Sequence, residues 1–420
     1  MTRLRESLAI LYAVILLFCV TLSQKVPNIA QNWPLLYVGI VLIFIWTCYV
    51  LSKIFVRKRL TISGVWASLL YFVLVFVIFL DVVINPQSRN AFVLNIILIH
   101  FFPIILVKIF IDKSVNFMLY TTAKILCIFS VLQAFIAWLF IAGWSFPLLG
   151  LDYQHNLIWG ARLHGLMGEP THFGLLLGIG LISLLYLYDR RQALSTVSRA
   201  ENMFFLLLSL FFIASIQFSG TRNALVATTL SLLVYAVFDR RVRKLLTKYI
   251  LACIPLALLL LVIFADVLII YLDILLAALR FGDSTSEDVR LLAIYNNLLM
   301  MSEFSFGELF FGVGYSESLV LTTSFNQYID ILRNFGFTWL LISILLIFMV
   351  FYAYVKKIRG GWSEGVYPFS LLIYCLSVFM FYSPMNAVFH IVAFVFVWSI
   401  FVCFTVQKKL VLNLDLVRPF

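Results

Sequence analysis

Apolar stretches of about 20 residues recur along the whole chain, and short polar segments separate them. Stretches of this length and composition are typical of helices that cross the hydrocarbon core of a bilayer. The pattern predicts twelve spans, at roughly residues 7–22, 35–52, 64–84, 91–112, 120–143, 165–188, 202–218, 223–238, 249–275, 327–355, 366–382 and 386–406. The expected fold is an all-α integral membrane protein in which residues 1–420 form a single polytopic domain.

The composition strengthens this prediction. Hydrophobic residues make up 64% of the chain and charged residues only 12%, whereas soluble domains carry about 25% charged residues. The six cysteines stand singly inside apolar stretches, which indicates buried side chains and not disulfides or metal ligands. Neither a metal ion nor a cofactor is expected.

The distribution of Lys and Arg predicts the orientation. Cytoplasmic loops of membrane proteins carry the excess of basic residues, and alternate polar segments of this chain are basic from the N-terminus onward. The two largest basic groups are Lys53, Arg57, Lys58 and Arg59, and Arg240, Arg241, Arg243, Lys244 and Lys248. Both termini are therefore expected in the cytoplasm. The net charge of +11 is interpreted as an orientation signal and not as a nucleic-acid surface.

Two outer loops are longer than the other connections, at residues 144–164 and 276–326. The second loop contains an amphipathic segment at 286–303, in which apolar side chains such as Tyr295 and Leu298 share one helical face. This helix is expected to lie on the membrane surface, with Arg290 and Asn297 toward the polar side.

Several charged residues on the predicted outer side do not follow the orientation rule. They are Arg162, Glu169, Arg222, Arg290 and Arg333. Converging guanidinium groups suit a phosphate ligand, because the planar fork binds phosphate through two hydrogen bonds. Each arginine also has a structural reading as a partner of lipid phosphate or of a nearby carboxylate. Two spacings favour structural pairs of this kind. Asp330 lies three residues before Arg333 and could pair with it, and Glu169 lies three residues before His172, which could hydrogen-bond its carboxylate.

Three segments, in this order, resemble a known family. They are RLHGLMGEPTHFG at 162–174, FSGTRNAL at 218–225 and SFNQYIDILRNFGFTWLL at 324–341. Together they resemble the signatures of O-antigen and exopolysaccharide polymerases of the Wzy type, within the O-antigen ligase–polymerase superfamily. The resemblance covers roughly residues 150–345.

The resemblance implies a GT-C-like glycosyltransferase of the bacterial inner membrane, acting on its periplasmic side without a metal. Such an enzyme transfers a growing glycan from undecaprenyl diphosphate onto a lipid-linked repeat unit. Expected partners are the lipid-linked donor and acceptor, membrane lipid and a candidate chain-length regulator, with no nucleic acid. The implied catalytic residues are Glu169, Arg222 and Arg290. The implied substrate-binding residues are Arg162, His164, His172, Arg280, Asn326, Tyr328 and Arg333.

Two other functions stay open. O-antigen ligases resemble the third segment but carry histidine before the asparagine, where this chain has Phe325 before Asn326, and a small residue where it has Trp339. A transporter or flippase of lipid-linked oligosaccharide also commonly has twelve spans. Such proteins place charges near mid-membrane and often repeat their halves, whereas here the polar groups concentrate at one face and the halves do not match.

Overall fold

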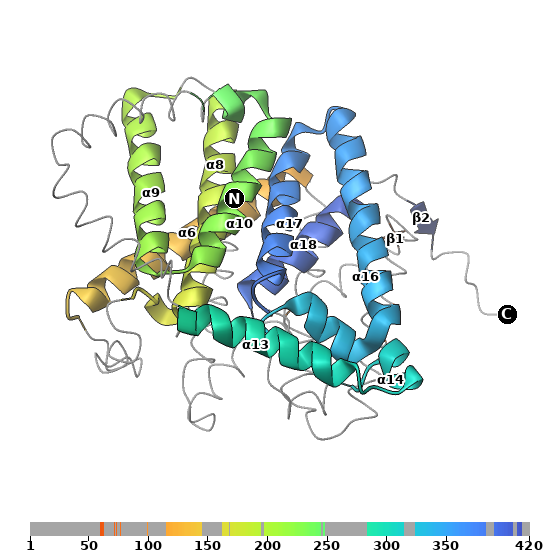
Figure 1. Cartoon of the computed structure of the whole chain (residues 1–420). Helices are drawn as coiled ribbons and strands as arrows, with labels where there is room; N and C mark the ends of the chain where they lie inside the picture. Colours follow the sequence, from red (N-terminus) through yellow and green to blue (C-terminus); the bar gives the residue numbers. More distant parts are fainter. Residues whose placement is uncertain are drawn as a thin grey trace. The chain divides into compact units, whose positions relative to one another are not determined.

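The structure is a computed structural model, shown in Figure 1. The residues that it describes are 59–62, 71, 73, 76, 99, 115–144, 162–167, 169–194, 197–244, 247, 284–314, 324–383, 390–405 and 410–413. The predicted spans before residue 115, apart from single positions, and the predicted span at 249–275 lie outside this part of the chain, as do Arg280 and most of the loop at 144–164. The count of twelve spans therefore stays a prediction.

Four described helices are long and apolar enough to cross a membrane. They are α6 (Val115–Ile141), α8 (Pro170–Leu194), α9 (Arg199–Phe218) and α16 (Gln327–Arg359). Three shorter apolar helices are α10 (Arg222–Phe238), α17 (Val366–Phe379) and α18 (Ile391–Thr405). Each of the seven coincides with a predicted span. The prediction of an all-α protein is confirmed for the described residues, and four of their helices could cross a membrane.

Helix α10 exposes apolar side chains along one face. Along α10, Val226, Leu230, Leu233 and Val237 form one stripe and are between 43% and 66% exposed. Exposed apolar stripes of this length are unfavourable in water and favourable against lipid acyl chains. The stripe is therefore the surface expected of a helix in a bilayer.

The chain forms two compact units, and the second comprises residues Leu126–Leu291. Within it α8 packs against both α9 and α10 (Figure 1). The contact between α6 and α8 is very close: a Cβ added at Gly180 would lie 2.4 Å from the Ser130 Cβ. The Ser130 hydroxyl also donates to the carbonyl of Leu176 over 3.2 Å. Small residues thus let these two helices approach, as is usual for helices packed in membranes.

The first unit comprises residues Met1–Ile125 and Leu292–Phe420. Its core is aromatic: Tyr354 donates to the carbonyl of Ser399 over 2.5 Å, and Tyr367 packs edge-on against Trp398. Strand β1 (Arg59–Ile62) pairs antiparallel with β2 (Leu410–Asn413). Both strands belong to segments predicted to be cytoplasmic, and this location stays a prediction.

The polar segment before α16 begins with two further helices, α13 (Ser284–Met301) and α14 (Phe306–Phe311). Helix α13 confirms the helix predicted at 286–303. At the start of α14, the Ser305 side chain and backbone N–H hydrogen-bond to the Glu308 carboxylate. These bonds hold the pKa of Glu308 below its usual value, and the pair forms a capping box.

Helix α16 is broken at Gly336, whose φ of 76° and ψ of 178° are not helical. The segment after α14 occupies the break: Val313 N–H donates to the carbonyl of Arg333 over 3.1 Å, and Gly314 N–H to that of Asn334 over 3.0 Å. A Cβ on Gly336 would lie 2.4 Å from the backbone of Phe310. Only glycine fits this backbone conformation and this contact.

We expect Gly336→Ala to destabilise the protein by about 1–3 kcal/mol from backbone strain alone, with the clash against Phe310 adding to this. Gly307→Ala is the matched control, because Gly307 lies in α14 with open space around its Cβ position. Unfolding of the purified protein by SDS compares the two. Equal stability of both variants would show that α16 is not broken at Gly336.

Candidate functional site

Glu169 lies directly before the first turn of α8. Its carbonyl accepts a hydrogen bond from the Phe173 N–H over 3.2 Å, and Pro170 is the first helical residue. Proline is favoured there because the first N–H of a helix has no intrahelical acceptor. The positive end of the helix dipole stabilises a carboxylate at this position. The sequence thus places an acid where the helix favours one.

Glu169 contacts His172, as the spacing predicts. The Nε2 of His172 lies 3.3 Å from the Glu169 Oε2. The Glu169 side chain is 35% exposed and that of His172 is 14% exposed. The carboxylate therefore has a protein partner and also keeps a surface that a ligand can reach.

The turn between α9 and α10 lies against the same helix entrance. The Thr221 hydroxyl donates to the carbonyl of Pro170 over 2.9 Å. A Cβ added at Gly174 would lie 2.7 Å from both Ser219 Oγ and Thr221 Oγ1. The segments 162–174 and 218–225, recognised separately in the sequence, therefore form one contiguous site.

Arg162 also contacts this turn. Its Nε donates to the carbonyl of Ser219 over 2.9 Å, and its Nη2 to that of Gly220 over 3.4 Å. These carbonyls lie just beyond the last residue of α9, where a cation is favoured by the negative end of the helix dipole. Arg162 thus has a clear structural role, and its binding of substrate stays a prediction.

Gln133 is a member of the site that the sequence argument missed. Its Oε1 accepts from the Leu166 N–H over 2.9 Å. A Cβ added at Gly165, whose φ is +53°, would lie 2.9 Å from the Gln133 carbonyl oxygen. His164, beside it, is 3% exposed, and its Nδ1 lies 3.0 Å from the Gly165 carbonyl. The signal in the sequence was an amide inside an apolar span, where polar side chains need partners.

Arg222 is the first residue of α10 and is partly exposed. The preceding Thr221 makes no side-chain cap to α10, since its hydroxyl donates to Pro170. The guanidinium and the positive end of the α10 dipole together favour an anion at this helix start.

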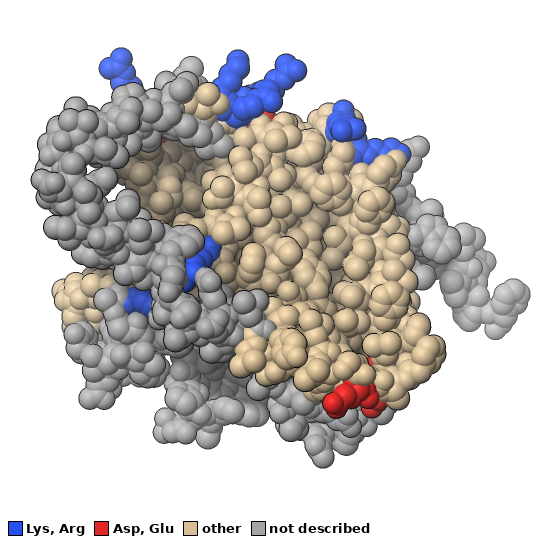
Figure 2. All heavy atoms as spheres, viewed as in Figure 1, with Lys and Arg blue, Asp and Glu red and all other residues tan. Residues whose placement is uncertain are grey.

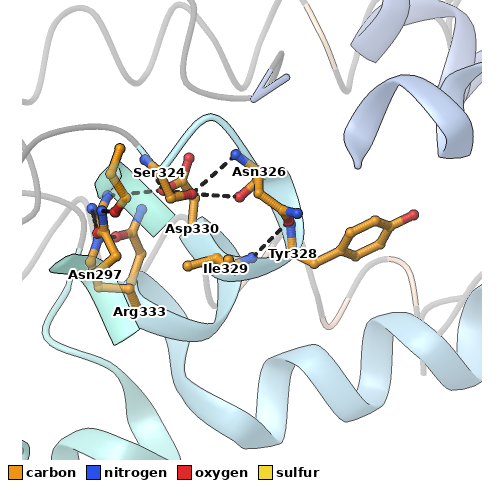
Figure 3. Close-up of polar contacts among 9 residues, drawn as sticks. Asn297, Ser324, Asn326, Tyr328, Ile329, Asp330 and Arg333 are labelled. Atoms are coloured by element: carbon orange, nitrogen blue, oxygen red, sulfur yellow. Dashed lines mark hydrogen bonds and ion pairs between the residues drawn. The ribbon is translucent and has the colours of Figure 1, made fainter. Parts of the chain in front are cut away.

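The third signature segment builds a buried polar network in the first unit (Figure 3). Arg333 Nη2 lies 3.3 Å from Asp330 Oδ1, so the predicted pair is confirmed. The guanidinium also donates to Asn297 over 2.5 Å and to Asn334 over 3.0 Å. Ser324 donates to Asp330 through its hydroxyl, over 2.8 Å. Asp330 is 0% and Arg333 is 2% exposed, so this pair is part of the protein core.

The prediction for Asn297 was wrong. Asn297 does not face the polar side of a surface helix; it is buried and accepts from Arg333. The reason is a partner 36 residues further along the chain, which the local periodicity does not contain. The exposed side chains of α13 include Tyr295 and Leu298, as expected for the apolar face of a helix at a membrane surface.

Asn326 and Tyr328 also have structural partners. The Asn326 side chain caps α16 by accepting from the N–H groups of Tyr328 and Ile329, and its amide donates to the carbonyl of Met380 over 3.1 Å. The Tyr328 hydroxyl donates to the carbonyl of Leu376 over 3.2 Å. Their substrate-binding roles stay predictions.

Two predicted residues are not placed by the described part of the chain. Arg280 lies outside it, and Arg290 lies in α13 but its side chain is not described. Among the described residues, no group of three His, Cys, Asp or Glu side chains could hold a metal ion. The comparisons with known proteins find no matching family model and no similar curated protein.

We expect Arg333→Met to lower the free energy of unfolding by about 3–5 kcal/mol, because it leaves the buried Asp330 carboxylate without its cation. Unfolding in SDS measures the loss. Arg199→Gln, at an exposed arginine, should change it by less than about 0.5 kcal/mol.

A second variant separates a structural from a binding role. The Asp330→Leu, Arg333→Met double variant removes both charges and should recover part of the stability. If Arg333→Met unfolds like the unsubstituted protein, the core role is wrong and Arg333 returns to the candidates for substrate binding.

Proposed function

We propose that this protein is a polysaccharide polymerase of the Wzy type, acting at the periplasmic face of the bacterial inner membrane. In this proposal it has twelve spans, a GT-C-like fold and cytoplasmic termini. The observation that supports it best is the contact between the segments at 162–174 and 218–225, which joins a partly exposed Glu169 to the turn that precedes Arg222.

The substrate follows from the charges and their place. A lipid-linked glycan donor carries its diphosphate at the membrane surface, next to the anomeric carbon. Arg222, at the positive end of α10, suits one phosphate of this group, and Arg290 is proposed to hold the other. These cations would stabilise the charge that develops on the departing diphosphate.

The proposed reaction is a glycosyl transfer. A hydroxyl oxygen of the acceptor repeat unit attacks the anomeric carbon of the donor glycan, and a new carbon–oxygen bond forms there. The bond from this carbon to the diphosphate oxygen breaks, and undecaprenyl diphosphate leaves with its electron pair. The hydroxyl proton passes to Glu169, whose side chain is 35% exposed and so can be reached by the acceptor.

His172 and Arg162 have supporting roles in this scheme. The imidazole holds Glu169 at 3.3 Å and so restricts the direction of the carboxylate. Arg162 fixes the turn before Arg222 through two carbonyls. Both residues are therefore proposed to position the groups that react, and His164 is buried.

One observation favours a flippase or transporter as the second candidate. Helix α16 is broken at Gly336 and carries a buried ion pair beside the break. Broken helices with polar groups are common at transporter binding sites. Here, however, three side chains of the protein itself bind the Arg333 guanidinium. The break is therefore better explained by a structural role than by substrate binding.

We expect Glu169→Gln to stop chain extension while lipid-linked single repeats accumulate, because the amide keeps the shape but cannot accept the proton. Gel analysis of polymer and of extracted lipid-linked repeats in cells measures both. Glu303→Gln, at an exposed glutamate of the first unit, is the control and should leave polymer unchanged. Polymer of normal length in Glu169→Gln would remove Glu169 from the mechanism.

Replacement of Arg222 tests the leaving-group step. Arg222→Ala should lower the polymerisation rate about a hundred- to a thousand-fold, as the loss of one donor to a developing oxyanion does in other enzymes. Arg222→Lys should recover only part of it, because lysine keeps the charge but lacks the planar fork. Protein levels in the membrane are measured alongside. Full activity of Arg222→Ala at a normal level would contradict the proposed diphosphate contact.

A further inference from the structure

We propose that residues 239–244 form a fixed binding site for the phosphate of anionic phospholipids. This segment, named here the Asp239-capped turn, comprises Asp239 and the first turn of the helix that begins at Arg240. It carries the side chains of Arg240, Arg241, Arg243 and Lys244. It belongs to the second unit and lies on the predicted cytoplasmic side. The inference does not depend on the proposed polymerase activity.

The turn is held in place at two points. Helix α10 ends at Phe238, and Asp239 is extended, with φ of −114° and ψ of 113°. Its Oδ1 accepts from the N–H groups of Arg241 over 2.8 Å and Val242 over 3.1 Å. Val242 is only 1% exposed, so its side chain anchors the turn in the protein. The cap and the anchor fix the backbone between four cations.

The cationic side chains point away from this anchored backbone. Arg240, Arg241, Arg243 and Lys244 are all exposed, and none of their side chains forms an ion pair with a residue of the described chain. Arg191 differs, since its guanidinium lies 3.0 Å from the Glu201 carboxylate. Figure 2 shows Lys and Arg side chains gathered at the end of α10 where the turn lies. The turn therefore offers several hydrogen-bond donors for a phosphate, and none of them is held in an ion pair by the described chain.

The neighbouring helix indicates where these cations lie relative to the bilayer. The exposed apolar stripe of α10 runs from Val226 to Val237 and ends two residues before Asp239. A helix of 17 residues is about 26 Å long, which is close to the hydrocarbon thickness of about 30 Å. The cations thus begin where the apolar surface stops, at the level of the lipid headgroups.

This continuity identifies the occupant as a lipid. A phospholipid can place its phosphate against the turn and its acyl chains along the α10 stripe. A soluble phosphate can contact only the cations. Basic groups at the cytoplasmic ends of membrane helices commonly bind anionic headgroups. A general orientation signal depends on the number of charges alone, whereas the Asp239 cap holds the backbone that carries these charges in one conformation.

The test compares two substitutions that remove the same charge. Asp239→Ala loses both the carboxylate and the cap, while Asp239→Asn loses the carboxylate and keeps a good capping side chain. The full-length protein is reconstituted in phosphatidylcholine vesicles, and spin-labelled phosphatidylglycerol and phosphatidylcholine report the relative association of each lipid. A thermal unfolding midpoint near that of the unsubstituted protein identifies variants that remain folded.

We expect Asp239→Ala to lower the preference for phosphatidylglycerol about five-fold relative to Asp239→Asn, the ratio that corresponds to the loss of one helix cap. Replacing the four cations by Gln should abolish the preference, and Arg191→Gln should leave it nearly unchanged. An equal or stronger preference in Asp239→Ala would overturn the proposal, since both variants carry the same charge. Equal displacement of the labelled lipid by soluble glycerophosphoglycerol would also overturn it, in favour of a site for soluble phosphates.

Discussion

The hydrogen bond from the Thr221 hydroxyl to the Pro170 carbonyl joins the two parts of the candidate site. It fixes the start of α8 against the turn that leads into α10, and Gly174 allows the close contact that the bond requires. Because Thr221 uses its hydroxyl in this way, it leaves the start of α10 without its usual side-chain cap. The same bond that builds the site thus also opens a helix end to an anion.

The first unit depends on a different interaction, the buried ion pair of Asp330 and Arg333. It lies in the short helical piece before the break at Gly336, and its hydrogen bonds reach α13 and the segment before α16. A buried ion pair adds little net stability, but loss of one partner is costly. The network therefore fixes one arrangement of these elements around the break.

Local patterns in the sequence predicted much of this. Hydropathy located all seven apolar helices described here, and three-residue spacing identified both the Glu169–His172 contact and the Asp330–Arg333 pair. The predicted span began near residue 165, whereas α8 begins at Pro170, five residues later. These features depend on helical geometry and on the bilayer thickness, both of which act over short stretches of chain.

Contacts between distant residues were beyond such patterns. Arg162 donates to carbonyls 57 and 58 residues away, and Gln133 binds a loop residue 33 residues further along the chain. The break in α16 was also missed, because the apolar pattern continues through Gly336 and only the packing of Phe310 against it requires the change in backbone. The prediction that Asn297 faces the polar side was wrong for the same reason. In each case the partner comes from another element of the fold.

The central claim is that the chain forms glycosidic bonds between lipid-linked repeats, and reconstitution tests it most directly. The purified protein is incubated in vesicles with an undecaprenyl-diphosphate-linked repeat unit, and released undecaprenyl diphosphate and glycan length are followed together. The account predicts lipid-linked glycans of increasing length, with one undecaprenyl diphosphate released for each bond formed. Movement of the intact lipid-linked repeat to the other leaflet, with no release and no longer glycan, would contradict it and identify a flippase.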